Sequence, residues 1–248
     1  MALAITVALG GSSIALALGV RGAPVPAVQQ RGAWIEPNVP YDGVFTFARI
    51  RYTVYRRSGW EFDYPTMERH LMTMVKEITS IRPHTDGSNI HTFDDPELLK
   101  YPLAYLSEPG WWYPSESECA GLRSYLARGG FLIVDDFYRS QWYNFEEQTH
   151  RCLPNAKIEQ LPSDHPIFDA FFSVKSPHMS HPDDNSAIAV WLGIYEDNDP
   201  AKRLMVVINY NNDIGDYMEW SDAGWWPVNT SNDAYKLAIN YIVYAMTH

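Results

Sequence analysis

The sequence predicts a three-layer α/β domain built on a doubly wound, mostly parallel sheet. Short runs rich in β-branched and aromatic residues alternate with helical runs, which is the order of parallel βαβ units. Residues 131–134 are uninterruptedly apolar, as expected of a central strand covered on both faces. A chain of 248 residues, of which 46% are hydrophobic and 20% charged, is long enough for one such domain with a sizeable core.

The first half of the chain gives the clearest pattern. Strands are expected where β-branched and aromatic residues cluster, at 44–52, 91–93, 103–106 and 131–134. The helices between them are expected at 64–78, capped by Asp63, and at 115–127, ended by the glycines at 129–130.

The second half is less regular. A helix is expected at 144–152, and a final helix at 232–246 places an apolar stripe toward the core. Short strands are expected between these helices, at 157–159, 187–194 and 204–208.

The N-terminal segment indicates export. Residues 1–20 carry no charge and are dominated by small and aliphatic side chains, so residues 1–27 are expected to be a signal peptide or an N-terminal anchor. No basic residue precedes the apolar run, which leaves both alternatives open. Residues 28–43 then form a linker or arm, the domain spans 44–248, and the protein is expected in the periplasm or cell envelope.

Charge and cysteine content limit the partners. The formal net charge of −11 argues against nucleic acid and anionic membranes, so membrane contact is expected only through an uncleaved N-terminal segment. Cys119 and Cys152 suit either one disulfide, as in exported proteins, or two buried thiols.

Asp135 and Asp136 follow the apolar strand at 131–134 and are the main candidate site residues. Ligands of open α/β sheets gather outside the carboxyl ends of the strands. Adjacent side chains on a strand point to opposite faces, so one carboxylate is expected to face the cleft, with Asp136 favoured. It would act as a metal ligand, a general base or an anchor for a ligand hydroxyl. Arg139, in the same loop, is a candidate ligand-binding residue. The structural alternative is that one Asp caps the next element while the other pairs with Arg139.

Further polar candidates lie in later loops. The segment 209–220 is dense in oxygen ligands that suit calcium or magnesium, although it lacks EF-hand spacing. Its candidate residues are Asn209, Asn211, Asp213, Asp216 and Glu219. His165, beside Asp164, is a candidate catalytic base. The His-x-x-His at 178–181 is a weak metal signal and is expected to be a solvated loop. No motif requires a cofactor or defines a metal site, and a divalent cation is one candidate.

Tryptophans are expected to crowd the same edge. The candidates for ligand stacking are Trp60, Trp111, Trp112, Trp142 and Trp220. Exposed rings at such an edge suit a sugar or another flat ligand. An aromatic lid that packs on itself is the equal alternative.

Four ordered segments carry a resemblance to a known family: residues 124–137, 164–168, 209–219 and 240–247. Together they resemble the bacterial domain-of-unknown-function family 4159 over residues 44–248. That family is similar in fold to class I glutamine amidotransferases and to ThuA-like proteins, which implies a flavodoxin-like sheet. Class I amidotransferases need a Cys, a His and a Glu at the site. Here the strand exit carries Asp135 and Asp136, and the late loop has Glu219 without a His, so glutamine hydrolysis by that triad is not expected.

Three functions follow from these features. The leading hypothesis is an exported domain that binds a small polar ligand such as a carbohydrate, through Asp135, Asp136 and Glu219 with stacking tryptophans. The second is a hydrolase in which a carboxylate, with His165 or a divalent metal, activates water. The third is an envelope protein whose aromatic loops bind a partner.

Overall fold

The computed structural model describes residues 35–54, 59–86, 88–174 and 177–248. The expected signal or anchor segment lies outside the described residues, as does the start of the linker. The described part of that linker, residues 35–43, contains no helix or strand. Asn38 fixes it to the domain by exchanging two hydrogen bonds with the backbone of Ile90. Among the described residues, no helix has the length and apolar character needed to cross a bilayer.

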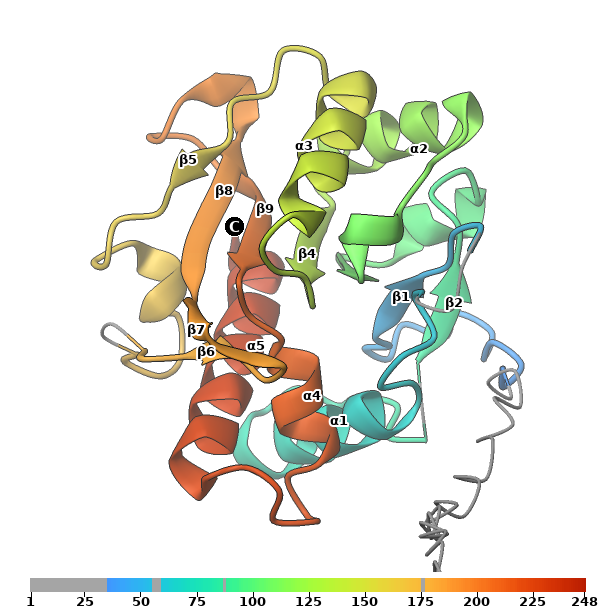
Figure 1. Cartoon of the computed structure of the whole chain (residues 1–248). Coiled ribbons are helices and arrows are strands. Elements are labelled where there is room, and N and C mark those ends of the chain that lie inside the picture. Colours follow the sequence, from blue (N-terminus) through green and yellow to red (C-terminus); the bar gives the residue numbers. More distant parts are fainter. Residues whose placement is uncertain (1–34, 55–58, 87, 175–176) are drawn as a thin grey trace, which may run out of the picture. The chain divides into compact units, whose positions relative to one another are not determined.

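A seven-stranded, mostly parallel sheet forms the centre (Figure 1). Its five parallel strands are, in spatial order, β2 (Asn89–His91), β1 (Ala48–Ile50), β3 (Leu103–Ser107), β4 (Phe131–Asp135) and β9 (Leu204–Tyr210). β8 (Val190–Tyr195) pairs antiparallel with β9, and β5 (Glu159–Gln160) pairs antiparallel with β8. The parallel strands follow the 2-1-3-4-5 order of flavodoxin-like sheets, and the predicted α/β class is confirmed.

Helices cover both faces of the sheet (Figure 1). On one face α1 (Thr66–Ile78) and α5 (Val228–Thr247) pack on a core that includes Phe47, Tyr105 and Ile133. On the other face lie α2 (Glu116–Ala127) and α3 (Gln141–Cys152), whose Leu122 and Phe145 meet side chains of β3, β4 and β9. Strands β3 and β4 are buried along their whole length because both faces are covered.

The capping residues explain why the start of α2 agrees with the sequence prediction and the start of α1 does not. α2 begins as expected because Ser115 and Glu118 form a capping box, and it ends before Gly129, whose φ is +101°. Asp63 does not cap α1, contrary to expectation. It has a φ of +62°, and α1 begins after Pro65 without a side-chain cap.

Several short elements had no sequence signal. The six-residue helix α4 (Ile214–Glu219) replaces an expected polar loop, and a hairpin of β6 (Ser180–His181) and β7 (Asp184–Ile188) replaces an expected solvated loop. Elements this short hold too few residues for a period to be read. The 3-10 helices are η1 (Pro96–Lys100), η2 (Pro109–Trp111), η3 (Pro166–Phe168) and η4 (Glu196–Asn198).

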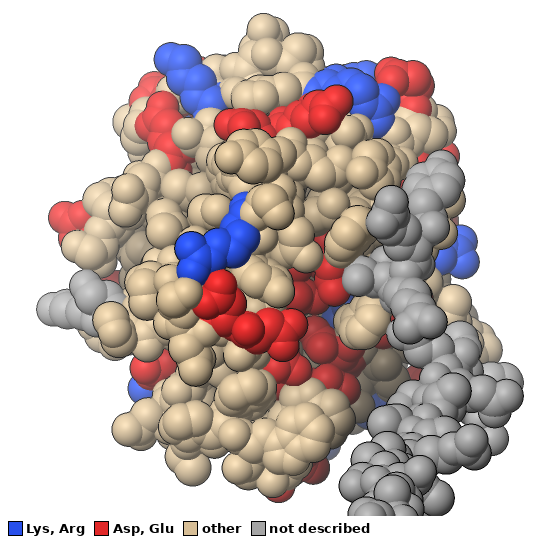
Figure 2. Space-filling model, viewed as in Figure 1, with Lys and Arg blue, Asp and Glu red and all other residues tan. Residues whose placement is uncertain are grey.

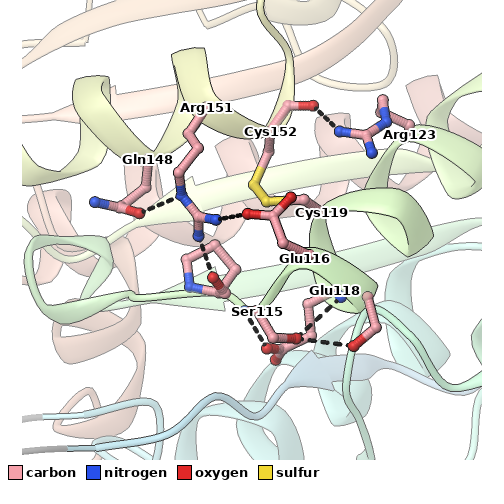
Figure 3. Close-up of a disulfide and its surroundings, with 10 residues drawn as sticks. Ser115, Glu116, Glu118, Cys119, Arg123, Gln148, Arg151 and Cys152 are labelled. Carbon is pink, nitrogen blue, oxygen red and sulfur yellow. Dashed lines mark hydrogen bonds and ion pairs between the residues drawn. A yellow bond between two sulfur atoms is a disulfide. The ribbon is translucent and has the colours of Figure 1, made fainter.

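Cys119 and Cys152 form a disulfide between α2 and α3 (Figure 3). This settles the alternative that the sequence left open. Arg151 of α3 crosses to Glu116 and to the carbonyl of Pro114, so the two helices are also joined by polar contacts. The layer on this face is therefore cross-linked covalently close to the start of α2.

Candidate functional site

Acidic side chains gather where the carboxyl ends of the parallel strands meet. Figure 2 shows a group of Asp and Glu side chains around a hollow on this face, between the end of β4 and α4. They come from four separate segments: the loop before α1, the end of β3, the end of β4, and α4 with the residue before it. We call this group the acidic cluster, and its members are Asp63, Glu108, Asp136, Asp213, Asp216 and Glu219.

Asp135 lies beneath the acidic cluster and braces the sheet. Its carboxylate is fully buried and accepts hydrogen bonds from the Tyr105 hydroxyl at 2.8 Å, the Asn209 amide at 2.9 Å and the Gly215 N–H at 3.1 Å. Asn209 is held in turn by the hydroxyl of Tyr241 at 2.9 Å. Burial raises the pKa of Asp135, while these donors oppose that shift. Asp135 and Asn209, both expected at the site, therefore fix β3, β4, β9 and α4 in place.

Asp136 belongs to the acidic cluster itself. It has a φ of +64°, is 7% exposed, and accepts a hydrogen bond from Ser107 Oγ at 3.0 Å. Its Oδ1 lies 3.8 Å from Nε2 of the buried His181. Asp136, His181 and Asp213 offer three ligand atoms that all lie within 4.8 Å of one another.

A second group of ligand atoms adjoins the first. Asp63, Asp216 and Glu219 also bring their carboxylate oxygens within 4.8 Å of one another. The two groups meet over Gly215, because a Cβ there would lie 2.6 Å from Asp63 Oδ2 and 3.2 Å from Asp213 Oδ1. A residue with a side chain at 215 would occupy this meeting point, so glycine keeps the cluster continuous.

Several carboxyls of the cluster have a raised pKa. Burial, followed by the charge of Asp136, raises the pKa of Asp63 and Asp213 well above the ordinary range. Burial and the charge of Glu219 raise the pKa of Asp216 to about 6, and burial with the charge of Asp136 raises that of Glu108 to about 9. A cation between these oxygens would relieve both the mutual repulsion and the loss of solvation.

A buried ion pair supports the loop that carries Asp63. Arg49 is fully buried, pairs with Glu68, and donates from Nη1 to the carbonyls of Trp60 and Phe62, each at 2.7 Å. Trp60 was expected to stack on a ligand, but it is only 6% exposed, so its ring is too buried to offer a stacking surface. Trp60 contributes to the site through its backbone carbonyl, which accepts a hydrogen bond from Arg49.

The hairpin β6–β7 brings His181 to the cluster. The Tyr217 hydroxyl donates to the carbonyl of Ser180 at 2.8 Å. Arg139 donates to Asp184 at 2.9 Å and to Ser186 at 2.6 Å, while Asn211 accepts from the backbone N–H of Arg139. Arg139 therefore holds the hairpin instead of pairing with Asp135 or Asp136, which corrects the structural alternative raised by the sequence.

His165 lies elsewhere. Its ring contacts Tyr195 and Tyr244, and the Tyr244 hydroxyl accepts from the N–H of Leu204, the first residue of β9. His165 is thus at the opposite edge of the sheet from the acidic cluster, where its Nδ1 caps η3. The histidine at the cluster is His181, and only the pairing of β6 with β7, which has no clear sequence signal, places it there.

The expected aromatic platform is smaller than predicted. Trp112 is 2% exposed and packs on Phe93, and Trp142 lies in α3, where it stacks on Phe137. Two expected tryptophans do reach the cluster. Trp111 lies beside Glu108 and Trp220 beside Asp216, since each indole N–H lowers the pKa of that carboxyl. Trp220 also stacks on Trp225 at 4.0 Å.

One family comparison covers this whole site. The family model described as a domain of unknown function, DUF4159, matches residues 46–246, and so includes the sheet, the hairpin and every member of the acidic cluster. No curated protein matches the chain. The match extends over most of the sequence and agrees with the resemblance seen in its motifs. The chain belongs to the DUF4159 family.

Proposed function

We propose that the acidic cluster binds a divalent cation and, through it, a small polar ligand such as a carbohydrate. The observation that carries the proposal is the pair of adjoining carboxylate groups at the carboxyl edge of the sheet, with the buried and unpartnered Nε2 of His181 facing one of them. Calcium, magnesium and manganese prefer the carboxylate oxygens that dominate both groups. The carboxyl edge is also where open α/β sheets bind their ligands.

The charge balance favours a cation. Arg49 is near enough to Asp63 and Glu219 to oppose the rise that burial causes in the pKa of both, but Glu68 already neutralises its charge. Asp63 and Asp213 are desolvated and face other carboxylates, which is costly for ionised groups. A divalent ion offsets this cost, whereas a neutral ligand alone leaves it in place.

The tryptophans support a flat, polar ligand beside the cation. Trp111 lies beside Glu108 and Trp220 beside Asp216, and Trp225, stacked on Trp220, is 63% exposed. Indole rings next to oxygen-rich sites suit the apolar face of a sugar. These rings make a carbohydrate the first ligand class to test.

We infer that the sheet is that of the amidotransferase-like, ThuA-like group, used here for other chemistry. Its flavodoxin-like strand order supports this fold. Both cysteines are joined in the disulfide, so neither is available as a nucleophile. The disulfide also supports export to an oxidising compartment, in line with the apolar N-terminal segment.

Hydrolysis is the second candidate function. A divalent cation lowers the pKa of bound water and so generates a nucleophile. Glu108, whose pKa is raised to about 9, would remain protonated at neutral pH next to Asp136. A carboxyl that stays protonated at neutral pH is what general acid catalysis needs.

Calorimetric titration tests the cation site. Protein freed of metal with EDTA is titrated with Ca²⁺, Mg²⁺ and Mn²⁺, and we expect saturable binding of at least one. Asp213→Asn should weaken that binding tenfold or more, whereas Asp197→Asn, an exposed carboxylate in η4, should change it less than twofold. Absence of binding by all three ions, or equal loss in both variants, would refute the proposal.

The ligand is tested separately. Tryptophan fluorescence is followed while a glycan panel is added to the cation-loaded protein and to the EDTA-treated protein. The proposal expects a response to some glycans that depends on the cation, and release of product would favour hydrolysis over binding alone. A flat response across the panel would argue against carbohydrate as the ligand class.

A further inference from the structure

His181 is fixed in the cluster with one ring nitrogen engaged and the other facing the carboxylates. The side chain is 3% exposed, and its ring lies against Tyr138 at 4.0 Å. Its Nδ1 accepts the backbone N–H of Asp183 at 3.2 Å. Its Nε2 is buried without a hydrogen-bond partner and points toward Asp136 Oδ1, 3.8 Å away.

These contacts define where the proton sits on a neutral His181. A backbone N–H is always a donor, so Nδ1 must present its lone pair, and the ring proton is on Nε2. An Nε2 that carries a proton has no lone pair for a metal. A ligating histidine has the reverse arrangement, because its other nitrogen usually donates a hydrogen bond that fixes the metal-binding tautomer.

We propose that His181 is not a ligand of the cation but donates its Nε2–H to an oxygen that the cation binds. The ion is then held by Asp136 and Asp213, with Asp63, Asp216 and Glu219 beside it. The oxygen is that of water or of a ligand hydroxyl or carboxylate. An all-oxygen set suits magnesium, manganese or calcium, whereas zinc sites usually include nitrogen or sulfur ligands.

The surroundings explain how this donor stays aimed. The ring packs against that of Tyr138. The hairpin that carries His181 is held by two hydrogen bonds, from Tyr217 to the carbonyl of Ser180 and from Arg139 to Asp184. The gap to Asp136 is too long for a direct hydrogen bond. A bound oxygen between them would partner the otherwise unsatisfied N–H, which is costly to leave buried alone.

The inference rests on the proposed cation site, and an experiment with Mn²⁺ can test the role of His181 separately from the existence of that site. Pulsed electron paramagnetic resonance of the Mn²⁺-loaded wild-type protein detects a directly coordinated ¹⁴N without any substitution. We expect no imidazole coupling. A coupling that is lost in His181→Gln would overturn the inference while leaving the cation site intact, and a spectrum of free Mn²⁺ alone would remove both.

Two variants test the donor role. His181→Gln keeps an N–H donor, so its Mn²⁺ affinity should stay within about threefold of wild type, whereas His181→Phe should bind about tenfold more weakly. The ratio of Mn²⁺ affinity to Zn²⁺ affinity should be unchanged in both variants, whereas loss of a nitrogen ligand would weaken Zn²⁺ binding more than Mn²⁺ binding. Equal affinities of the Gln and Phe variants, or a changed metal preference, would contradict the proposal.

Discussion

The backbone at individual residues aims the carboxylates of the acidic cluster. Asp63, Glu108 and Asp136 all adopt left-handed conformations, with φ of +62°, +52° and +64°. Such conformations are uncommon for residues with a side chain and cost on the order of 1 kcal/mol each. Their concentration around one hollow indicates that side-chain placement at this edge outweighs local stability.

Asp213→Asn should stabilise the metal-free protein. The burial and neighbouring charges that raise the pKa of Asp213 make its ionised form unfavourable, and Asn removes that charge. Asn keeps the oxygen that caps α4 through the N–H of Asp216, so the helix start is preserved. In EDTA we expect the melting temperature to rise by about 2–4 °C, equivalent to about 1 kcal/mol in a domain of this size.

The same pair of proteins provides the control. In saturating Mn²⁺ the order should reverse, because wild type gains binding energy that the variant lacks. A variant that melts below wild type in EDTA would show that the charge of Asp213 is already compensated without a cation.

Single residues also show what sequence could reveal about the site. The position of Asp135 and Asp136 follows from an apolar strand and the edge rule, and both lie where the sequence put them. The sequence could not show that Asp135 is buried beneath the cluster while Asp136 belongs to it. Asp135 is held there by hydrogen bonds from Tyr105, Asn209 and Gly215, which are distant in sequence. The sequence favoured His165 over His181, whereas the structure places His181 at the cluster. Each histidine precedes a proline in a polar segment, and only tertiary contacts separate them.

At the scale of elements, the predictable parts are those with a long period or a defined cap. The helix at 115–127 has a capping box and a glycine stop, and the observed α2 matches it within one residue. The strand at 131–134 was clear because both its faces are buried. α4 and the hairpin β6–β7 were missed because tertiary contacts, such as those of Tyr217 and Arg139, stabilise them more than local propensity does.

Removing the disulfide should destabilise the domain without changing its fold. Cys119 and Cys152 are 33 residues apart, and a cross-link over such a loop stabilises a protein by about 2–5 kcal/mol. The double variant Cys119→Ala/Cys152→Ala should lose about this much in urea denaturation followed by circular dichroism.

Reduction supplies the matching control. Dithiothreitol should lower the stability of wild type toward that of the double variant and leave the variant unchanged. An unchanged wild type under full reduction would mean that the disulfide adds little to the α2–α3 layer.

At the scale of the whole molecule, many of the buried carboxylates lie together instead of being spread over the protein. The net charge of −11 is accompanied by a concentration of carboxylates at one edge of the sheet (Figure 2). Composition predicts that anionic partners are disfavoured, but it could not show this gathering of carboxylates, because Asp63 and Asp213 are 150 residues apart in sequence. The fold brings them together over Gly215.

The stability of the metal-free protein should fall as pH rises from about 4 toward 9. A carboxyl whose pKa is raised in the folded state contributes stability below its ordinary value and loses it as pH passes the folded value. The window starts near 3.8 for Asp216, which titrates at about 6, and extends upward through Glu108 at about 9. Asp184, whose pKa is lowered mainly by Arg139, acts in the opposite sense below pH 4.

Thermal melts in EDTA across this range would measure the effect. The loss of stability above pH 5 should be much smaller when a saturating divalent cation is present, because the cation compensates the ionised carboxylates. Parallel pH profiles with and without the cation would contradict this explanation.

The central claim is that the acidic cluster holds a divalent cation, and anomalous diffraction from crystals soaked in Mn²⁺ tests it most directly. We predict a peak at the cluster with carboxylate oxygens of Asp136 and Asp213 about 2.0–2.6 Å from the ion. His181 Nε2 should lie outside that shell. Fully occupied Mn²⁺ elsewhere on the protein with none at the cluster, or no peak at concentrations where calorimetry saturates, would contradict the claim.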